Sequence, residues 1–348
     1  MSKTKILCVY DGGITKELME QMRELEQYGA EISFVEDKEM YAMGPITDRM
    51  LLIEQHGVDA APTCKEFLDA CTDKDILVVH VASINKEIID ACPNLKVAAV
   101  LRGGIENADI KALDNRNVPL INAPWRSADA VADFTVGMMI AENKNIARSH
   151  KLIFQGEWCK KYVNQEYIHN MRNCTVGLIG YGYIGSRVAK RLLGFESKVL
   201  VYDPFVDPSQ MEGENVTCVG LDELLEQSDF VSIHLRLSEQ TQKFMNAEKF
   251  SKMKKTAYFI NTARSGIVDT DALVHALQEK EIGGAAIDVY DVEPLPLDHP
   301  YLKLNNITLT SHLAGTSCDT MRTSVEIGVE ELKRYLTGEP MRNIRNLK

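Results

Sequence analysis

Short apolar runs alternate with amphipathic segments along the first hundred residues of the chain. Continuous apolar runs of this length are typical of strands buried on both faces, so the pattern predicts a mainly parallel sheet with helices across it. Residues 17–29 and 85–92 have helical spacing, whereas residues 41–65, with Pro45 and Pro62, predict an irregular surface excursion. The predicted strands lie at residues 5–10, 31–36, 75–82 and 96–101.

A second alternating series follows a long helical segment at residues 127–150. It predicts a second sheet of parallel strands, after which residues 316–338 return to helix. A chain of 348 residues with two such series is expected to form two α/β domains. The six strands predicted for the second sheet lie at residues 175–180, 198–203, 229–235, 256–262, 284–290 and 306–312.

The sequence GYGYIG, at residues 180–185, joins the first strand of the second series to the helix that follows. In this spacing Gly180 permits a tight turn, Gly182 lets the backbone approach a pyrophosphate, and Gly185 lets the helix pack against the strand. The next strand ends in Asp203, whose carboxylate suits the ribose hydroxyls of an adenosine and would repel a 2′-phosphate. These residues predict a dinucleotide site that favours NAD over NADP.

Three later strands each end in a side chain suited to hydride chemistry, namely Arg264, Glu293 and His312. Ligands of an open parallel sheet bind beyond the carboxyl ends of its strands, so we expect these three residues to converge on the nicotinamide. His312 is the predicted acid/base, because imidazole titrates closest to neutrality. Glu293 is predicted to orient the imidazole and stabilise its charged form, and Arg264 to grip the substrate carboxylate and polarise the reacting oxygen.

These segments resemble the D-isomer-specific 2-hydroxyacid dehydrogenase family. The resemblance covers nearly the whole chain and is strongest from about Leu95 to Asn343. The matching segments are LKVAAVLRGGIENAD, VPLINAPWRSADAVADFTVGMMIA, GLIGYGYIG with YDP, SEQTQKFMN, AYFINTARSGIVDTDAL, GGAAIDVYDVEP, NITLTSHLAGTS and GEPMRNIRN.

The resemblance implies how the domains are organised. A Rossmann-like, doubly wound NAD-binding domain at residues 106–314 would be inserted into a flavodoxin-like substrate-binding domain formed by residues 1–105 and 315–348. The substrate domain would close over the cofactor domain, and the insertion would explain why the glycine loop lies in the middle of the chain. The long helix beginning near Ser127 would contribute to a two-fold homodimer.

The resemblance also implies ligand contacts. The backbone N–H groups of Gly103 and Gly104 would bind the substrate carboxylate together with Arg264. Arg102 stands where many members have serine, and it would be either a second cationic contact to the substrate or an ion-pair partner. Arg236 and Ser311 replace prolines that are common in the family. The remaining cofactor-binding positions implied are Tyr183, Ile184, Thr262, Ala263, Asp288, Thr135 and Thr241.

The composition of the chain favours some classes of binding partner over others. A formal net charge of −11 disfavours nucleic acid and anionic membranes as partners, so a small-molecule partner fits better. The eight cysteines show no C-x-x-C pair and no zinc-ligand spacing with histidine, so we expect reduced thiols and no metal site. The start of the chain lacks a secretion pattern and the densest apolar run, at residues 136–141, is too short to span a bilayer, so we expect a cytoplasmic protein.

Two functions from different classes fit these residues. The leading interpretation is an NAD-dependent oxidoreductase that interconverts a D-2-hydroxy acid and its 2-oxo acid. The alternative is an NAD(H)-sensing protein that uses the same fold to bind protein partners. The presence of Arg264, Glu293 and His312 together favours the enzyme. The identity of the substrate depends on a pocket around residues 80–83, Arg102 and residues 41–65, which the sequence alone leaves open.

Overall fold

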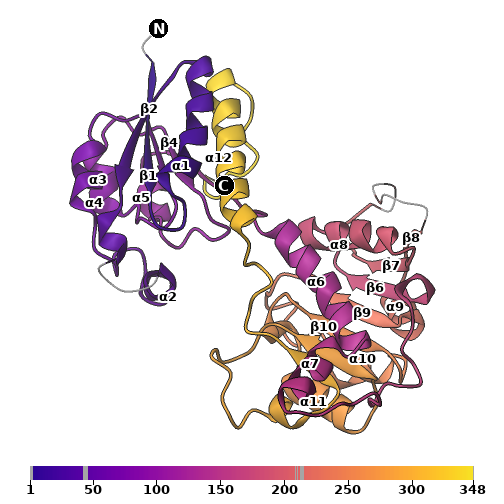
Figure 1. Ribbon diagram of the computed structural model, residues 1–348. Helices are drawn as coiled ribbons and strands as arrows, with labels where there is room; N and C mark the ends of the chain where they lie inside the picture. Colours follow the sequence, from indigo (N-terminus) through magenta and orange to yellow (C-terminus); the bar gives the residue numbers. More distant parts are fainter. Residues whose placement is uncertain (1–2, 42–45, 208, 210, 212–214, 348) are drawn as a thin grey trace. The chain divides into compact units, whose positions relative to one another are not determined.

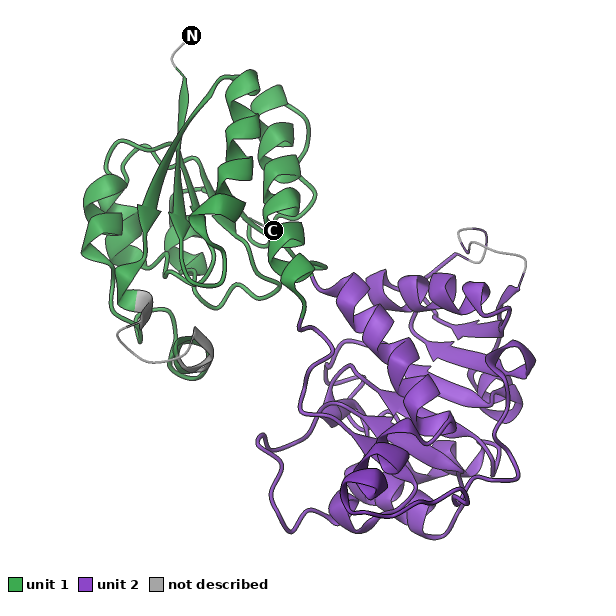
Figure 2. Ribbon diagram, in the orientation of Figure 1, with its two compact units in different colours: residues 1–126, 317–348 green, residues 127–316 purple. Residues whose placement is uncertain are grey.

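The computed structural model describes residues 3–41, 46–207, 209, 211 and 215–347. The chain divides into two compact units, one formed by Met1–Arg126 with Ser317–Lys348 and the other by Ser127–Thr316 (Figures 1 and 2). The second unit is therefore inserted into the first along the chain. Among the described residues, no helix combines the length and the apolar character needed to cross a bilayer.

The first unit is built on a five-stranded sheet in which every strand pairs in parallel with its neighbour. Buried aliphatic residues fill the strands because both faces are covered, as the apolar runs predict. The strand order is β2-β1-β3-β4-β5, the flavodoxin-like arrangement. The strands are β1 (Thr4–Tyr10), β2 (Ala30–Glu36), β3 (Ile76–Val79), β4 (Val97–Val100) and β5 (Leu120–Asn122).

Helices cover both faces of this sheet. Ile6 and Cys8 face the cluster that contains Met22 and Val325, whereas Leu7 and Val9 face the opposite cluster. One layer contains α1 (Lys16–Met19), the 3₁₀ helix η1 (Glu20–Tyr28) and the C-terminal α12 (Cys318–Thr337), which lies beside η1 (Figure 1). The other layer contains α3 (Lys65–Ala70), α4 (Lys86–Ala91) and α5 (Ile110–Asn115).

Two features of the first unit differ from the expectations. Strand β5 pairs with β4, so residues 106–126 belong to the first unit, whereas the expected boundary at residues 105 and 106 gave them to the second. The excursion expected at residues 41–65 contains a regular helix, α2 (Ile46–His56), which follows the short η2 (Lys38–Tyr41). Arg49 of α2 forms a fully buried ion pair with Asp37, 2.9 Å apart, which ties this helix to the end of β2.

The second unit contains a seven-stranded parallel sheet in the order β12-β11-β10-β9-β6-β7-β8. The sequence predicts six of its strands and misses the three-residue β8. The order reverses between β6 and β9, as in a doubly wound Rossmann-like sheet. The strands are β6 (Thr175–Ile179), β7 (Lys198–Tyr202), β8 (Val216–Cys218), β9 (Phe230–Ile233), β10 (Tyr258–Asn261), β11 (Gly284–Ile287) and β12 (Ile307–Leu309).

Alternate strand residues of this sheet enter two separate cores. Phe230 and Leu178 pack with α6 (Ala128–Asn143) and α8 (Tyr183–Gly194), and Val231 and Ile179 pack with the helices on the other face. Those helices are α9 (Leu221–Gln227), α10 (Ala247–Ser251) and α11 (Thr270–Gln278). The short elements η3 (Met171–Asn173), η5 (Ser265–Ile267) and η6 (Pro300–Lys303) lie in connections, and α7 (Ile146–Phe154) follows α6.

Candidate active site

The glycine loop lies at the carboxyl end of β6, where the strand order of the second sheet reverses. Gly180 has φ 99°, and a Cβ atom there would lie 2.9 Å from the carbonyl oxygen of His234. A Cβ atom at Gly185 would lie 2.1 Å from the carbonyl oxygen of Gly180. Both positions therefore require glycine, for the left-handed backbone and for the close approach of helix and strand.

The N-terminus of α8 is open toward a ligand. Gly182 is the residue that caps this helix, and among the described residues no side chain caps its first turn. A Cβ atom at Gly182 would meet no atom of the described residues within 4 Å. Backbone N–H groups at the start of a helix suit an anionic pyrophosphate, so the site fits NAD. Tyr183 and Ile184, the predicted pyrophosphate contacts, form the first turn of this helix.

Asp203 connects the end of β7 to the glycine loop. Its carboxylate accepts hydrogen bonds from the backbone N–H of Tyr181 at 2.8 Å and of Phe205 at 2.9 Å. The structure therefore places the acid beside the loop, as the sequence predicts for a ribose-binding carboxylate.

Two predicted cofactor residues come together behind the end of β10. The hydroxyl oxygens of Thr135 and Thr262 lie 2.7 Å apart, and Thr135 also donates to the carbonyl of Val131. The Asn261 side chain shapes the turn by accepting from the N–H of Ala263 and donating to the carbonyl of Arg264.

Thr241 lies apart from that pair, on an exposed turn. Its hydroxyl donates to the carbonyl of Arg236 and accepts from the N–H of Ser238. These bonds give Thr241 a role in shaping the turn, and its predicted cofactor contact remains a prediction.

His312 and Glu293 form a hydrogen-bonded pair. His312 Nδ1 lies 2.8 Å from Glu293 Oε2 and 3.0 Å from Oε1, and both side chains are partly exposed. Because the carboxylate accepts from Nδ1–H, the tautomer assigned from this contact leaves Nε2 free to exchange a proton with a ligand. His312 has φ 55°, a left-handed conformation that is uncommon for residues other than glycine.

Asp288 holds the segment that contains His312. Its buried carboxylate accepts from the Thr310 hydroxyl at 2.6 Å and from the backbone N–H groups of Leu313 and Ala314, each at 2.9 Å. These bonds bracket His312 on both sides and stabilise its unusual backbone conformation. The predicted contact between Asp288 and the nicotinamide amide remains a prediction.

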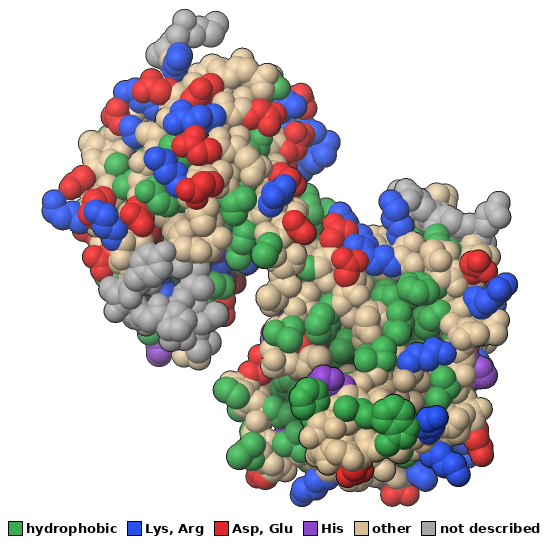
Figure 3. Space-filling view, viewed as in Figure 1, with side chains coloured by type: hydrophobic (Ala, Val, Ile, Leu, Met, Phe, Trp, Pro, Cys, Tyr) green, Lys and Arg blue, Asp and Glu red, His purple; other side chains and the backbone are tan. Residues whose placement is uncertain are grey.

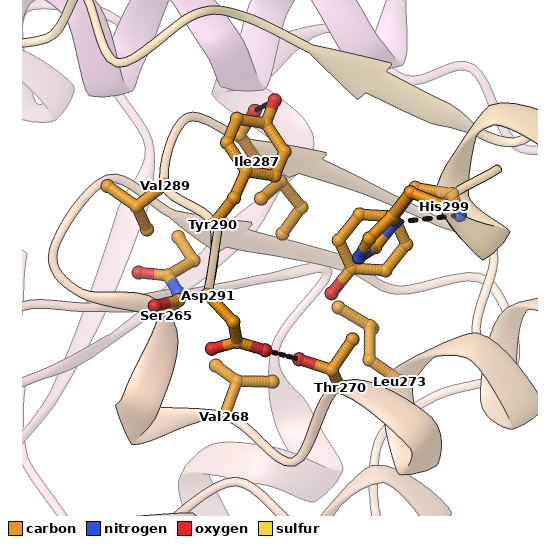
Figure 4. A pocket seen from close by; sticks show the side chains of 11 residues that line it. Ser265, Val268, Thr270, Leu273, Ile287, Val289, Tyr290, Asp291 and His299 are labelled. Atoms are coloured by element: carbon orange, nitrogen blue, oxygen red, sulfur yellow. Dashed lines mark hydrogen bonds between the residues drawn. The ribbon is translucent and has the colours of Figure 1, made fainter. Parts of the chain in front are cut away.

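The loop that contains Glu293 rests on a tightly packed base. Tyr290 donates its hydroxyl to the carbonyls of Thr310, at 2.7 Å, and Ile287, and burial raises its pKa to about 12. Asp291 points toward Thr270 and accepts its hydroxyl hydrogen bond (Figure 4). The hollow among these side chains has a volume of about 10 Å³, about that of one water molecule, so it supports the loop and holds no organic ligand.

Arg264 is exposed on the loop after β10. Its Nη1 donates to the carbonyl of Ala263 at 2.7 Å, a contact within its own turn. The remaining donors of the guanidinium fork are available for a carboxylate.

His234 follows β9 and packs against the glycine loop, and it is not among the residues predicted from the sequence. Its ring Nε2 lies 3.0 Å from the hydroxyl of Ser232. Burial lowers the pKa of His234 to about 4, so its ring is neutral at physiological pH. The rule that found Arg264, Glu293 and His312, a polar residue just beyond a buried strand, would have found this histidine too.

The first unit presents its own polar residues at the carboxyl ends of its strands. Asp11 follows β1 and His80 follows β3, and His80 Nδ1 lies 3.0 Å from both carboxylate oxygens of Asp11. Arg102, Gly103 and Gly104 follow β4. Gly103 is exposed, and its carbonyl accepts from the side chain of Asn122.

The second unit thus combines a dinucleotide loop, an oriented imidazole and an available guanidinium, an arrangement suited to hydride and proton transfer. Across the described ranges, no group of three or more His, Cys, Asp or Glu side chains is placed to hold a metal ion.

Residues 136–314 match the family model described as "D-isomer specific 2-hydroxyacid dehydrogenase, NAD binding domain". The chain is 40% identical over 291 residues to a glyoxylate reductase of Thermofilum pendens, covering 81% of this chain and 84% of that protein. It is 32% identical to a D-3-phosphoglycerate dehydrogenase of Methanocaldococcus jannaschii, covering 86% of this chain but only 57% of that longer protein.

Among solved structures, the NAD-complexed D-isomer specific 2-hydroxyacid dehydrogenase of Lactobacillus delbrueckii ssp. bulgaricus shares the fold. Its TM-score is 0.77 at 23% identity, with 99% of this chain and 100% of that chain covered. Taken with the dinucleotide loop and the matched family model, these relatives show that the chain belongs to the NAD-dependent D-isomer specific 2-hydroxyacid dehydrogenases.

Proposed function

We propose that this enzyme interconverts a small D-2-hydroxy acid and its 2-oxo acid, with His312 as the acid/base. The observation that carries the proposal is the hydrogen bond between His312 and Glu293, on a segment held in place by Asp288. Relatives named glyoxylate reductase and hydroxypyruvate reductase make small 2-oxo acids the first substrates to test.

His312 would move one proton in each turnover. Bound NAD(H) would supply the hydride acceptor or donor at its nicotinamide ring. During oxidation, Nε2 of His312 accepts the proton of the substrate hydroxyl, and during reduction it returns that proton to the carbonyl oxygen. Glu293 keeps Nδ1 protonated and stabilises the imidazolium that forms.

The substrate would be held by its carboxylate. The guanidinium of Arg264 suits a bidentate contact with a carboxylate and can polarise the neighbouring oxygen on C2. The backbone N–H groups of Gly103 and Gly104 are proposed as further carboxylate donors. The cofactor would be held by the first turn of α8, by Asp203 at the adenosine ribose, and by Thr262, Ala263, Thr135, Thr241 and Asp288.

A panel assay tests this function. NADH oxidation would be followed with glyoxylate, pyruvate, hydroxypyruvate and larger 2-oxo acids, using the native enzyme and His312→Ala. We expect turnover by the native enzyme and a loss of at least about 100-fold in the variant, with NADH affinity changed by less than about threefold. Comparable loss of NADH binding in the variant would show that His312 has a different role.

We also infer that the enzyme is a homodimer. Helix α7 has no buried residue, although its sequence is amphipathic. Phe154 at its end is 81% exposed and the nearby Trp158 is 80% exposed. Figure 3 shows hydrophobic side chains gathered on the face of this unit on which α7 lies. Exposed aromatic residues of this kind commonly cover a subunit interface, and a second copy of the chain is the proposed occupant.

The dimer can be tested by mass in solution. Phe154→Glu with Trp158→Glu should convert a dimer to a monomer in sedimentation velocity, whereas Phe205→Glu, an exposed aromatic residue outside α7, should not. A native protein that sediments as a monomer at micromolar concentration would contradict the inference. The expected cytoplasmic location stays a prediction.

A further inference from the structure

Arg102 is a buried cation with an unused donor. Only 3% of the residue is exposed, and its Nη1 atom has no hydrogen-bond partner in the described part of the chain. Burying an unpaired guanidinium donor costs free energy, because the donor loses its hydrogen bonds to water and forms none within the protein. An anionic ligand that reaches Nη1 would satisfy this donor.

The ion pair with Glu54 uses only one of the two amino groups of the Arg102 guanidinium. Nη2 of Arg102 lies 3.1 Å from Glu54 Oε1. The Glu54 side chain is 44% exposed, so it is well hydrated and can separate from Arg102 at low cost. Both alternatives that the sequence leaves open therefore have a structural basis: one amino group of Arg102 is paired and the other remains free.

Arg126 provides a second cation in the same unit. Its Nη1 lies 3.4 Å from His80 Nε2 and 3.4 Å from the Ser324 hydroxyl. His80 donates from Nδ1 to Asp11, so its Nε2 can accept from Arg126, and the three side chains form a chain that orients the guanidinium. Burial and the like charge of Arg102 lower the pKa of Arg126 to about 10.

The carboxylate oxygens of Asp11 accept hydrogen bonds from groups within the protein, and its negative charge offsets part of the lowering of the Arg126 pKa. Asp11 accepts hydrogen bonds from the backbone N–H groups of Gly13, Ile14 and Val81, besides the His80 ring. With four donors directed at it, the carboxylate is already satisfied within the protein.

The position of these residues in the fold favours a ligand site. In the strand order β2-β1-β3-β4-β5, the switch point lies between β1 and β3, whose carboxyl ends lead into Asp11 and His80. Ligands of open α/β sheets bind at such a point. Arg102 immediately precedes Gly103 and Gly104, the proposed carboxylate donors.

We propose that Arg102 and Arg126 form a subsite for a second anionic group of the substrate, a carboxylate or phosphate at the end remote from the reacting carbon. This inference rests on the proposed function, since it assigns the substrate class of that reaction as 2-oxo and 2-hydroxy acids with a second anionic group, called dianionic substrates here whatever the charge of that group. Arg102 and Arg126 bind the group that distinguishes dianionic substrates, whereas the carboxylate that all substrates share is bound by other donors, Gly103 and Gly104 among them.

Matched substrate pairs test the assignment by activity. 2-Oxoglutarate differs from 2-oxovalerate by a distal carboxylate, and 3-phosphohydroxypyruvate differs from hydroxypyruvate by a phosphate. We expect kcat/KM to favour the dianionic member of at least one pair by about 10- to 100-fold, the effect of one or two hydrogen bonds to a charged group. The pair with the larger ratio identifies the group as carboxylate or phosphate.

Binding tests the same assignment without turnover. In the presence of NADH, dissociation constants would be measured by calorimetry for D-2-hydroxyglutarate against D-2-hydroxyvalerate, and for D-3-phosphoglycerate against D-glycerate. We expect the native enzyme to show the dianion preference here too, and Arg102→Met to reduce the ratio to within about twofold. Glu54→Gln should keep or increase the preference, because it frees Nη2 and leaves the guanidinium in place.

One control variant and one further variant of the subsite separate this site from general effects of charge. Lys86→Met removes a cation from the exposed surface of the same unit, where Lys86 pairs with Asp90, and should leave both ratios unchanged. Arg126→Met should weaken the preference by at least about fivefold even if Arg102→Met fails to fold.

The outcomes are distinct. If the native enzyme shows no dianion preference, the subsite is overturned. It is also overturned if Arg102→Met weakens the binding of both members of a pair equally, and this result would assign Arg102 to the shared carboxylate. Absence of NADH oxidation with every oxo acid would contradict the proposed function, while the binding ratios would still decide the subsite.

Discussion

His312 Nδ1 lies 2.8 Å from Oε2 of Glu293, within hydrogen-bond distance, although the two residues follow different strands of the second sheet. A second bond, from the backbone N–H of Tyr290 to Glu293 Oε1 at 3.0 Å, holds the carboxylate. The imidazole is therefore oriented before any ligand arrives, which is the condition for efficient proton transfer.

Replacing Glu293 with glutamine should impair catalysis more than binding. The amide is neutral and cannot stabilise the imidazolium, so we expect kcat for reduction to fall by about 100-fold while the KM for NADH changes by less than about threefold.

A matched control exists in the same unit. Glu281 lies 3.9 Å from His275 in a second, surface pair of glutamate and histidine. Glu281→Gln should leave kcat and the KM for NADH unchanged. An unchanged kcat in Glu293→Gln would show that the carboxylate only supports the fold.

Replacing Asp203 with alanine should relax cofactor selectivity. Removal of its negative charge lets a 2′-phosphate approach the end of β7, so the ratio of kcat/KM for NADPH to that for NADH should rise by about tenfold or more. Loss of the hydrogen bonds to Tyr181 and Phe205 should lower the free energy of unfolding by about 1–2 kcal/mol. Asp222→Ala, at an exposed partner of Lys252, is the control, and an unchanged cofactor ratio in Asp203→Ala would remove Asp203 from the ribose site.

The sequence predicts the longer elements and the residues at their ends because a buried strand and the turn after it have local signatures. Arg264, Glu293 and His312 were found in this way, each beside its apolar run. Strands β5 and β8, each of three residues, were missed, whereas the equally short β12 was found because it lies in the run NITLTSH. The misplaced boundary follows directly from the missed β5, since its pairing with β4 joins residues 106–126 to the first unit.

Interactions between residues that are distant in the sequence could not be predicted, because no local pattern marks them. The pairing of Arg49 with Asp37 depends on how α2 packs against the end of β2, and the chain from Asp11 through His80 to Arg126 joins three strand ends. Arg102 could be singled out only because it departs from a family pattern, and its buried, half-paired state is visible only in the folded chain.

Breaking the buried ion pair at α2 should be costly. Arg49→Met leaves Asp37 buried without its partner, and we expect the apparent free energy of unfolding to fall by about 3–5 kcal/mol at neutral pH. Burial already raises the pKa of Asp37, so protonation should relieve part of this loss as the pH falls.

A double variant separates loss of the pair from loss of packing. Arg49→Met with Asp37→Leu should recover most of the stability, because no uncompensated charge remains. Urea unfolding followed by circular dichroism measures both, with the exposed Lys86→Met as the control expected to change stability by less than about 0.5 kcal/mol. If the single and double variants lose the same free energy of unfolding, the loss comes from packing and not from the unpaired charge.

His234 should make the enzyme sensitive to mild acid. The pKa of His234 is lowered to about 4 in the folded protein, whereas an unfolded histidine titrates near its ordinary value of 6.5. Between these values the unfolded chain binds more protons, so stability falls as the pH falls, by about 2 kcal/mol from pH 7 to pH 5.

The glutamine of His234→Gln can keep a hydrogen bond to Ser232 but does not titrate. The free energy of unfolding of this variant should therefore fall by about 2 kcal/mol less than that of the native enzyme between pH 7 and pH 5. Urea unfolding at pH 7 and pH 5 measures the difference, and His275→Gln controls for an exposed histidine. If the native enzyme and His234→Gln lose the same stability between these pH values, the histidine beside the glycine loop is accessible to protons in the folded state, and another group must account for any acid sensitivity.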